Sequence, residues 1–331
     1  MRLRTIGLTG ILLLPHLASA AARDLCYLRD AAAPTATTAY VLCEQGMIYG
    51  TKDGGATWTT YKTGAKEIVH SVAFSDANNG FVVGDAGTLL ATEDGAKTWQ
   101  ARTTGTTENL LTVYAIGHEV WAAGFDGVML YSANGGRSWK AQDGGTTQGI
   151  EDIYFADPQH GWASGWCGAI LRTVDGGAKW QAIATQATWT LGSVYFRDLN
   201  NGWAVGFSGE ILRSRDGGVT WAVEKSPVNS ILSSVAVDRS NRIWIAADDK
   251  LLVSEDGGDT WRAVPIQYNL FLAKLLPVGN SLWAMGELGV LKQEASGMEW
   301  KRLDSLVPAS SQIADSLDTS VFKGADTVEG K

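Results

Sequence analysis

The stretch TKDGGATW at residues 51–58 recurs six more times along the chain, and this repetition decides the fold. The other copies are TEDGAKTW (92–99), SANGGRSW (132–139), TVDGGAKW (173–180), SRDGGVTW (214–221), SEDGGDTW (254–261) and a degenerate QEASGMEW (293–300). Their tryptophans are 41, 40, 41, 41, 40 and 39 residues apart. A period this constant over most of a 331-residue chain indicates a repeat architecture.

Each repeat contains four short strand-like segments separated by turn residues. In the fifth repeat they are residues 193–196, 202–205, 210–214 and 221–224. Four antiparallel strands in a repeat of about 40 residues form the blade of a propeller. The sequence therefore predicts an all-β, seven-bladed β-propeller with the Asp-Gly-Gly turn between strands three and four. In the first blade, the innermost strand is expected at Leu25–Leu28 and the next at Tyr40–Cys43.

The residues of the repeated motif have a structural explanation. Aspartate accepts hydrogen bonds from the amides of its own turn, and glycine adopts the positive φ angles that other residues resist. The tryptophan is expected to begin the fourth strand and to bury its ring between neighbouring blades. These residues are therefore predicted to build turns and not a binding site.

The two ends of the chain lie outside the repeat. Arg2 and Arg4, the apolar stretch 6–17 and Ala18-Ser19-Ala20 are typical of a secretory signal peptide over residues 1–20. The propeller is expected at residues 21–306, followed by a polar tail at 307–331. We expect an exported protein without stable membrane insertion, in the periplasm or, in a photosynthetic host, the thylakoid lumen.

Charge and cysteine content narrow the classes of ligand. The formal net charge is −8, which is a poor match for nucleic acid or anionic lipid. Cys26 and Cys43 could form a disulfide in an oxidising compartment, or both could be unpaired core residues, while Cys167 is left over. Three scattered cysteines without clustered histidines do not suggest a metal site, and neither a metal nor a cofactor is predicted.

Two longer runs resemble a known family. SVAFSDANNGFVVGDAGTLLATEDGAKTW (71–99) and SVYFRDLNNGWAVGFSGEILRSRDGGVTW (193–221) are similar to the Ycf48/Hcf136 photosystem II assembly and stability family, and the resemblance covers residues 24–306. It implies a propeller that binds a newly made membrane protein and assists its assembly without catalysis. Arginines proposed to form a surface patch in that family correspond here to Arg172 and Arg213, whereas Ala91 and Val253 occupy the position in other blades.

An enzyme is the alternative, because sialidases also carry Asp-boxes. Their arginine motif, Phe/Tyr-Arg-Ile-Pro, has no counterpart, since the nearest run, YLRD at 27–30, lacks the Ile-Pro. No Ser-His-Asp, Walker or dinucleotide motif stands out. We therefore expect no catalysis. A secreted sialidase-like glycoside hydrolase, with an acid pair such as Glu151-Asp152 facing the channel, or a glycan-binding propeller, remains the alternative.

Partner binding is predicted on the loops between strands two and three. One position after the strand-two glycine can be followed around the ring, and it is aromatic in three consecutive blades and acidic in the rest: Glu44, Asp85, Phe125, Trp166, Phe207, Asp248 and Glu287. The hypothesis assigns protein binding to these aromatic residues, to Trp189 in a nearby connection and to the two arginines. Alternatively, the rings fold back over the gaps between blades.

The inner strands predict a narrow, wet channel. One position there carries mostly small polar residues: Ser71, Thr112, Asp152, Ser193, Ser234 and Lys274.

Overall fold

The computed structural model describes residues 28–43, 45–266, 271–286, 289–294 and 297–303. The predicted signal peptide at 1–20 and the tail at 307–331 lie outside the described residues.

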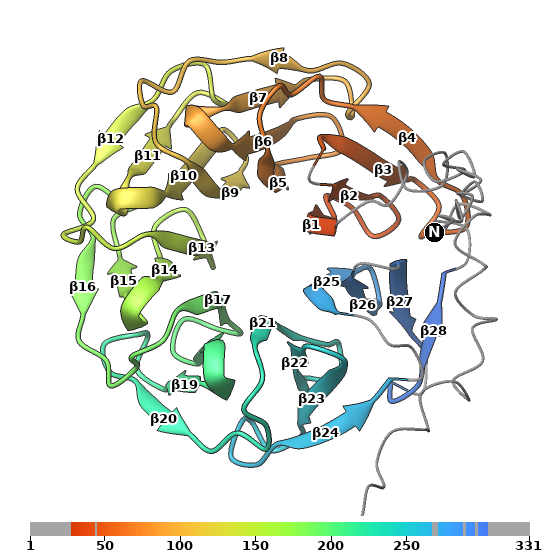
Figure 1. The fold of residues 1–331 in the computed structure, drawn as a ribbon, viewed down its shortest axis with the longest axis vertical. Coiled ribbons are helices and arrows are strands. Elements are labelled where there is room, and N and C mark those ends of the chain that lie inside the picture. The colour runs from red at the N-terminus through yellow and green to blue at the C-terminus, as the bar shows by residue number, and fades with distance from the viewer. Residues whose placement is uncertain (1–27, 44, 267–270, 287–288, 295–296, 304–331) are drawn as a thin grey trace, which may run out of the picture. The chain divides into compact units, whose positions relative to one another are not determined.

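Seven four-stranded antiparallel sheets follow one another around a central axis (Figure 1). The strands of blades one to four are β1 (Leu28–Ala32), β2 (Ala39–Cys43), β3 (Met47–Thr51), β4 (Thr59–Lys62), β5 (Val69–Phe74), β6 (Gly80–Gly84), β7 (Leu89–Thr92), β8 (Gln100–Ala101), β9 (Leu110–Ile116), β10 (Glu119–Gly124), β11 (Met129–Ser132), β12 (Lys140–Gln142), β13 (Ile150–Phe155), β14 (Gly161–Gly165), β15 (Ile170–Thr173) and β16 (Gln181–Ile183). Those of blades five to seven are β17 (Leu191–Phe196), β18 (Gly202–Gly206), β19 (Ile211–Ser214), β20 (Ala222–Glu224), β21 (Leu232–Val237), β22 (Ile243–Ala247), β23 (Lys250–Ser254), β24 (Arg262–Pro265), β25 (Leu272–Val278), β26 (Ser281–Gly286), β27 (Gly289–Gln293) and β28 (Trp300–Arg302). The predicted fold class is confirmed.

The first blade differs from its prediction in one strand. Its innermost strand is Leu28–Ala32, so the expected Leu25–Leu28 is wrong by several residues. The prediction followed the apolar residues, but the inner strand of every blade needs a small or polar side chain at the channel, and Asp30 supplies it here. Blade one forms its sheet from β1 to β4 alone, so the ring closes without strand exchange among the described residues.

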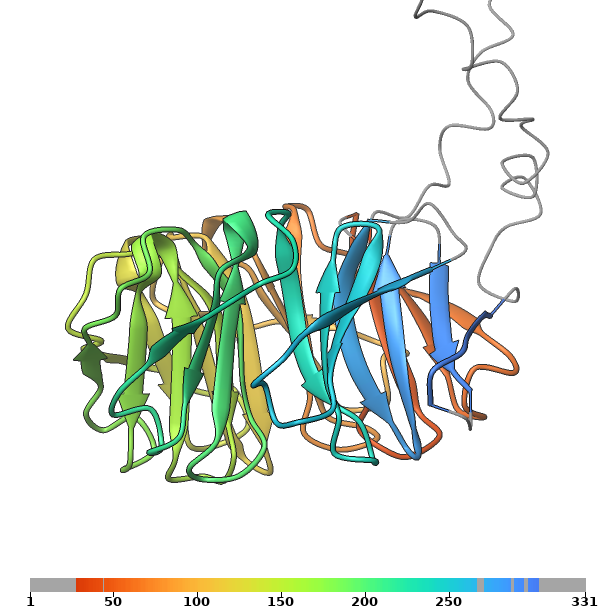
Figure 2. The same cartoon turned by 90° about the horizontal axis from the view of Figure 1, so that it is seen from below.

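The loops divide between two faces, which Figure 2 shows as the two rims of the ring seen edge-on. On one face, Asp-box turns bond to the turns between strands one and two, as in Gly217 N–H to Asn200 O at 3.0 Å. On the other, loops between strands two and three bond to the connections between blades, as in Phe207 N–H to Thr190 O at 3.0 Å. We call these the Asp-box face and the loop face.

The Asp-box turns have the predicted mechanics. In blade five, Asp216 accepts the Thr220 amide at 2.9 Å, and Ser214 Oγ accepts the Gly218 amide at 2.8 Å. In blade one, hydrogen bonds from the side chain and backbone of Thr57 hold the pKa of Asp53 at about 2. Such turns are self-contained, which is why they recur in the sequence.

Aromatic rings bind neighbouring blades together. Trp162 on strand two of blade four stacks on Phe196 of blade five with ring centroids 3.6 Å apart. The edge of the Asp-box tryptophan Trp221 meets the same Phe196 at 5.6 Å, so its ring lies at a blade junction as predicted, although β20 begins one residue after it. Sequence analysis overlooked the strand-two ring, which is fully buried in five blades at Trp121, Trp162, Trp203, Trp244 and Trp283.

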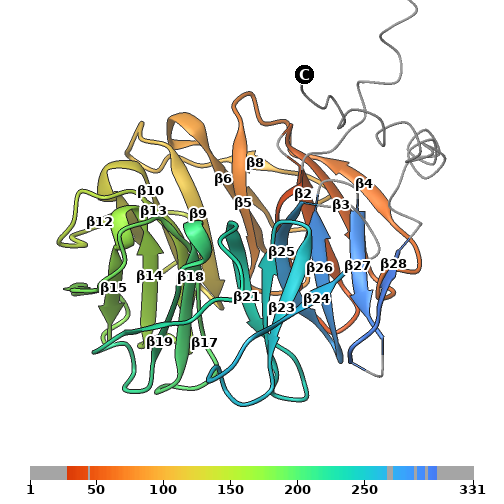
Figure 3. The ribbon, with the colours of Figure 1, turned by 60° about the horizontal axis from the view of Figure 1, so that its bottom comes forward.

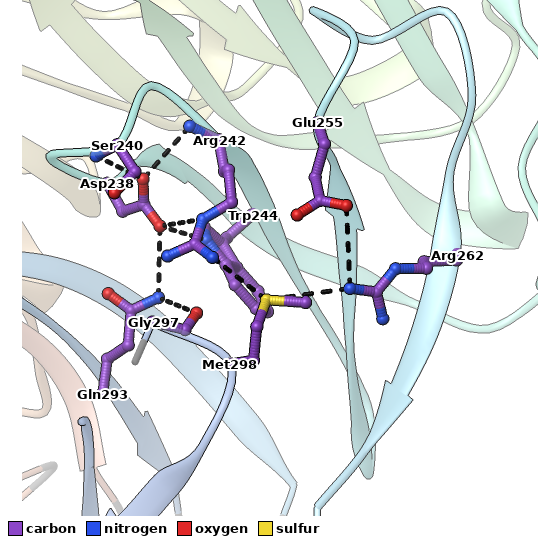
Figure 4. Close-up of polar contacts among 9 residues, drawn as sticks. All are labelled: Asp238, Ser240, Arg242, Trp244, Glu255, Arg262, Gln293, Gly297 and Met298. Carbon is purple, nitrogen blue, oxygen red and sulfur yellow. Dashed lines mark hydrogen bonds and ion pairs between the residues drawn. The ribbon is translucent and has the colours of Figure 1, made fainter. Parts of the chain in front are cut away.

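The junction between blades six and seven uses a different device, because the seventh Asp-box is degenerate. In blades three and four the strand-two tryptophan donates to the next Asp-box turn, Trp121 to Gly176 O at 3.0 Å and Trp162 to Gly217 O at 2.9 Å. Trp244 instead donates to the buried carboxylate of Asp238 at 2.9 Å. Figure 4 shows Asp238 also holding Arg242 (2.8 Å) and Gln293 of blade seven (3.2 Å).

In blades two to five and in blade seven, strand two ends in a glycine that a close backbone approach requires. In blade five, a Cβ on Gly206 would lie 2.0 Å from Thr190 O and 2.8 Å from Leu191 Cα. We expect Gly206→Ala to cost about 1–3 kcal/mol of folding free energy, measured by thermal or urea denaturation. Gly192→Ala is the control, since its nearest neighbour, Leu232 O, is 3.9 Å away. Equal stability of the two variants would contradict this explanation.

Candidate functional site

Four loop-face turns share one conformation. They are the 3-10 turns η1 (Asp85–Gly87), η2 (Phe125–Gly127), η3 (Trp166–Gly168) and η4 (Phe207–Gly209). Each turn has its middle residue at a positive φ between 52° and 57°. The first residue of each turn is the position that sequence analysis followed around the ring. Glu44 and Glu287 lie outside the described residues.

Phe125 and Trp166 form a packed pair. Their rings meet edge to face with centroids 4.9 Å apart, and both side chains are half-buried. The Trp166 indole N–H donates to the Glu151 carboxylate, and its ring lies over Gly149, where a Cβ would approach within 2.8 Å. The rings of these two residues therefore fold back in part over the gaps between blades, as in the alternative interpretation of this position.

Phe207 and Trp189 are the exposed aromatic residues of this sector, at 42% and 52%. The Trp189 amide donates to the Glu210 carboxylate at 3.3 Å, and its carbonyl accepts the Gly168 amide at 2.8 Å. Trp189 thus lies between the loop-face turns of blades four and five. Both rings are available to a partner.

Phe207 is exposed because its own blade offers it no side chain on the inner strand. Fifteen residues before the turn, His70 contacts Asp85 at 2.7 Å in blade two, and Glu151 contacts Trp166 in blade four. The same position in blade five is Gly192. The fifteen-residue spacing is visible in the sequence, but a prediction from the loop position alone does not include the inner-strand residue.

The loops of this face are acidic. We counted charges in the described residues of the turns after strand two and of the blade connections at 63–68, 102–109, 143–149, 184–190 and 225–231. Eight side chains are acidic and three are basic: Glu67, Asp85, Glu108, Asp126, Asp143, Glu210, Asp248 and Asp249 against Lys66, Arg102 and Lys225. The face therefore favours positively charged ligands.

The channel residues link the blades in sequence (Figure 3 shows the inner strands around the axis). An inner-strand oxygen accepts an amide of the next blade at several junctions: Asp30 from Val72 (3.1 Å), Ser71 from Val113 (3.2 Å), Asp152 from Val194 (3.0 Å), Ser193 from Val235 (3.4 Å) and Ser234 from Leu275 (3.1 Å). The polar residues that predicted a wet channel therefore connect neighbouring blades in the first place. We call this series of hydrogen bonds between inner strands the belt.

The belt closes with an ion pair. Lys274 of blade seven cannot accept a hydrogen bond from a backbone amide. Its ammonium instead lies 3.1 Å from the Asp30 carboxylate of blade one. Burial opposes the charge of Lys274, but Asp30 and Asp152 outweigh this effect and raise its pKa. Burial raises the pKa of Asp152, and the attraction of Lys274 only partly offsets it.

The two predicted arginines lie apart from the aromatic sector. Arg172 Nε donates to Gly217 O of the next blade at 2.7 Å. Arg213 is only 9% exposed and pairs with Asp259 of the next blade at 2.6 Å. Both therefore brace Asp-box turns on the opposite face, and the structure does not bring them together with the aromatic residues. A role in partner binding stays a prediction.

The remaining candidates are the cysteines and any group of side chains that could hold a metal ion. Cys43 takes part in a disulfide bond, while Cys26 lies outside the described residues, so that pairing stays a prediction. Cys167 is free and exposed at the middle of η3. Within the described part of the chain, no group of three or more His, Cys, Asp or Glu side chains could hold a metal ion. No helix in that part is long and apolar enough to cross a membrane.

The fold and its turns define the class as a seven-bladed Asp-box propeller. The chain belongs to the family of the photosynthesis system II assembly factor YCF48, whose family model matches residues 57–143 and 178–276. The family resemblance found in the sequence is confirmed. No curated protein sequence matches the chain.

Solved structures share the fold at low identity. A structure described as YCF48 bound to D1 peptide is 22% identical, with 74% of this chain and 84% of that chain covered and a TM-score of 0.62. YCF48 from Cyanidioschyzon merolae is 19% identical, with 81% and 95% covered and a TM-score of 0.67. An ancestral GH74 enzyme is 16% identical, with 83% and 46% covered and a TM-score of 0.65. At these identities the likeness shows the fold alone.

Proposed function

We propose that this protein is an exported, non-catalytic scaffold that holds a polypeptide partner on its loop face and assists assembly or stability of a membrane complex. Family membership supports the proposal, and a solved relative is described as bound to a D1 peptide. The predicted signal peptide supports action in the periplasm or the thylakoid lumen. The acidic charge of the chain argues against nucleic acid as the partner.

One observation carries the proposal. Trp189 and Phe207 are large exposed rings on adjacent loops, beside the half-buried pair Phe125 and Trp166. Exposed tryptophan and phenylalanine next to a packed aromatic cluster match the anchor residues of protein interfaces, which bury large apolar area at small entropic cost. Neither side chain belongs to a buried core cluster of the propeller, so packing alone does not explain two large apolar groups at this surface.

The test is a double variant, Trp189→Ala with Phe207→Ala. We expect partner recovery from detergent-solubilised membranes of the host to fall at least about tenfold, because each anchor contributes on the order of 1–2 kcal/mol of binding. The thermal melt should stay nearly unchanged. Recovery is measured by quantitative mass spectrometry after affinity capture of the full chain.

Blade five also provides the matched control. Leu199 and Val219 are equally exposed, at 45% and 52%, but lie on the Asp-box face. Leu199→Ala with Val219→Ala should leave recovery unchanged. An equal loss in both double variants would show general stickiness and contradict the proposed face. Robust turnover of glycosides by the wild-type chain would overturn the non-catalytic scaffold in favour of the hydrolase alternative.

A further inference from the structure

The channel mouth on the loop face holds open space next to Gly192, on the inner strand of the blade that carries Phe207. A cavity of about 320 Å³ is lined there by residues that include His70, Glu151, Asp152, Gly192 and Lys274. The missing side chain of Gly192 leaves a notch, because an added Cβ would find only Leu232 O, at 3.9 Å. In blade four the equivalent side chain, Glu151, contacts the turn residue Trp166. Gly192 therefore leaves room for a side chain from outside at the position that contacts the loop-face turn in blades two and four.

The charge around this notch is negative. Asp30, Glu151 and Asp152 line the mouth together with the basic residues Arg29 and Lys274. Three carboxylates against two basic side chains leave one formal negative charge uncompensated, and the Lys274 ammonium lies 3.1 Å from Asp30. Glu210, directly after the turn of blade five, adds further negative charge at the rim. A cation entering the mouth would gain favourable Coulomb energy in a partly desolvated site.

From this combination we propose that the loop face takes a basic and apolar polypeptide segment, with one apolar side chain in the Gly192 notch against Phe207 and a neighbouring lysine or arginine in the channel mouth near Asp152. The inference rests on the proposed function and specifies the chemistry of the partner. The cavity is large enough for one long side chain, whereas Trp189 covers the flanking residues of the segment from the blade connection. An acidic segment would meet like charge on the loops and in the mouth.

Synthetic peptides test the chemistry directly. The probe is a short fluorescein-labelled peptide of leucine and lysine with serine spacers. Two comparison peptides have the same sequence, one with glutamate in place of lysine and the other with serine in place of leucine. Fluorescence anisotropy with the full chain is measured at low salt and at about 0.15 M. We expect the leucine–lysine peptide to bind at least about tenfold more tightly than either comparison peptide, and its affinity to fall as the salt concentration rises.

Two variants locate the peptide. Gly192→Leu fills the notch, and Asp152→Asn removes a charge but keeps an oxygen for the Val194 amide. Each is expected to weaken the leucine–lysine peptide by about tenfold, with thermal melts close to wild type. If Gly192→Leu fails to fold, Phe207→Ala replaces it in the same measurement.

The outcomes separate this inference from the proposed function. Equal binding of the lysine and glutamate peptides, or binding unaffected by both variants, overturns the inference. If native partner capture still depends on Trp189 and Phe207, the proposed function stands with a partner of different chemistry. If capture is also independent of these rings, both are wrong.

Discussion

Asp238→Ala is expected to lower the free energy of unfolding by about 3–5 kcal/mol, with a fall in Tm of roughly 6–15 °C. The Asp238 side chain is 1% exposed and the Arg242 side chain 14%. Removing the carboxylate leaves a buried guanidinium without its partner and also takes the acceptors from Trp244 and Gln293. Urea denaturation followed by tryptophan fluorescence measures the loss.

Asp198→Ala in the neighbouring blade is the matched control. Asp198 also caps its own turn, by accepting the amides of Asn200 and Asn201, but its side chain is 46% exposed and does not bridge two blades. We expect a loss of about 1 kcal/mol there. Comparable losses in the two variants would contradict the role of Asp238 as a junction.

The effect of Asp238 depends on pH with a definite sign. Burial opposes its ionisation, but hydrogen bonds from Trp244 and Arg242 outweigh burial and lower its pKa. A carboxyl with a lowered folded-state pKa stabilises the fold above its unfolded pKa of about 3.9 and loses that contribution as pH falls through the folded value. The difference between wild type and Asp238→Ala should therefore be full at neutral pH and narrow in acid.

Lys274→Met is expected to cost about 2–4 kcal/mol at neutral pH, because it leaves Asp30 and Asp152 in the channel without their shared cation. Other contacts of the closing junction include Lys292 Nζ with Gly54 O at 3.5 Å, the Trp58 and Trp283 rings, 5.9 Å between centroids, and a buried apolar cluster that contains Val41 and Val278. Because no strand in the described part of the chain is exchanged between blades seven and one, we expect this junction to open first. Native-state hydrogen exchange in β1 and β25 measures the opening.

A double variant distinguishes charge from packing. Adding Asp30→Asn to Lys274→Met removes one uncompensated carboxylate and should recover part of the lost stability, which a purely steric effect would not allow. Ser234→Ala at the preceding junction removes one neutral acceptor for the Leu275 amide and should cost about 1 kcal/mol. A Lys274→Met loss no larger than that of Ser234→Ala would show that the ion pair is not the closing contact.

The site shows where prediction from sequence ended. The loop position occupied by Phe125, Trp166 and Phe207 could be followed from the repeat because each blade has the same spacing. The sequence pattern could not predict whether each aromatic ring is exposed, because exposure depends on the side chain opposite the ring. Glu151 holds Trp166, and Gly192 leaves Phe207 exposed. The arginines show the same limit, because Arg213 is engaged by Asp259 of the next blade, 46 residues later.

By itself, the sequence determined the number of blades, the four-stranded pattern of the repeat and the mechanics of the Asp-box turns. These features depend on contacts within about 40 residues, which the period repeats in every unit. Only the tertiary structure decided how the ring closes, how blade six holds a degenerate blade seven and which aromatic residues face a partner. Those outcomes depend on single side chains meeting across blade junctions, where Lys274 meets Asp30 and Asp238 meets Gln293, and no period in the sequence records such pairs.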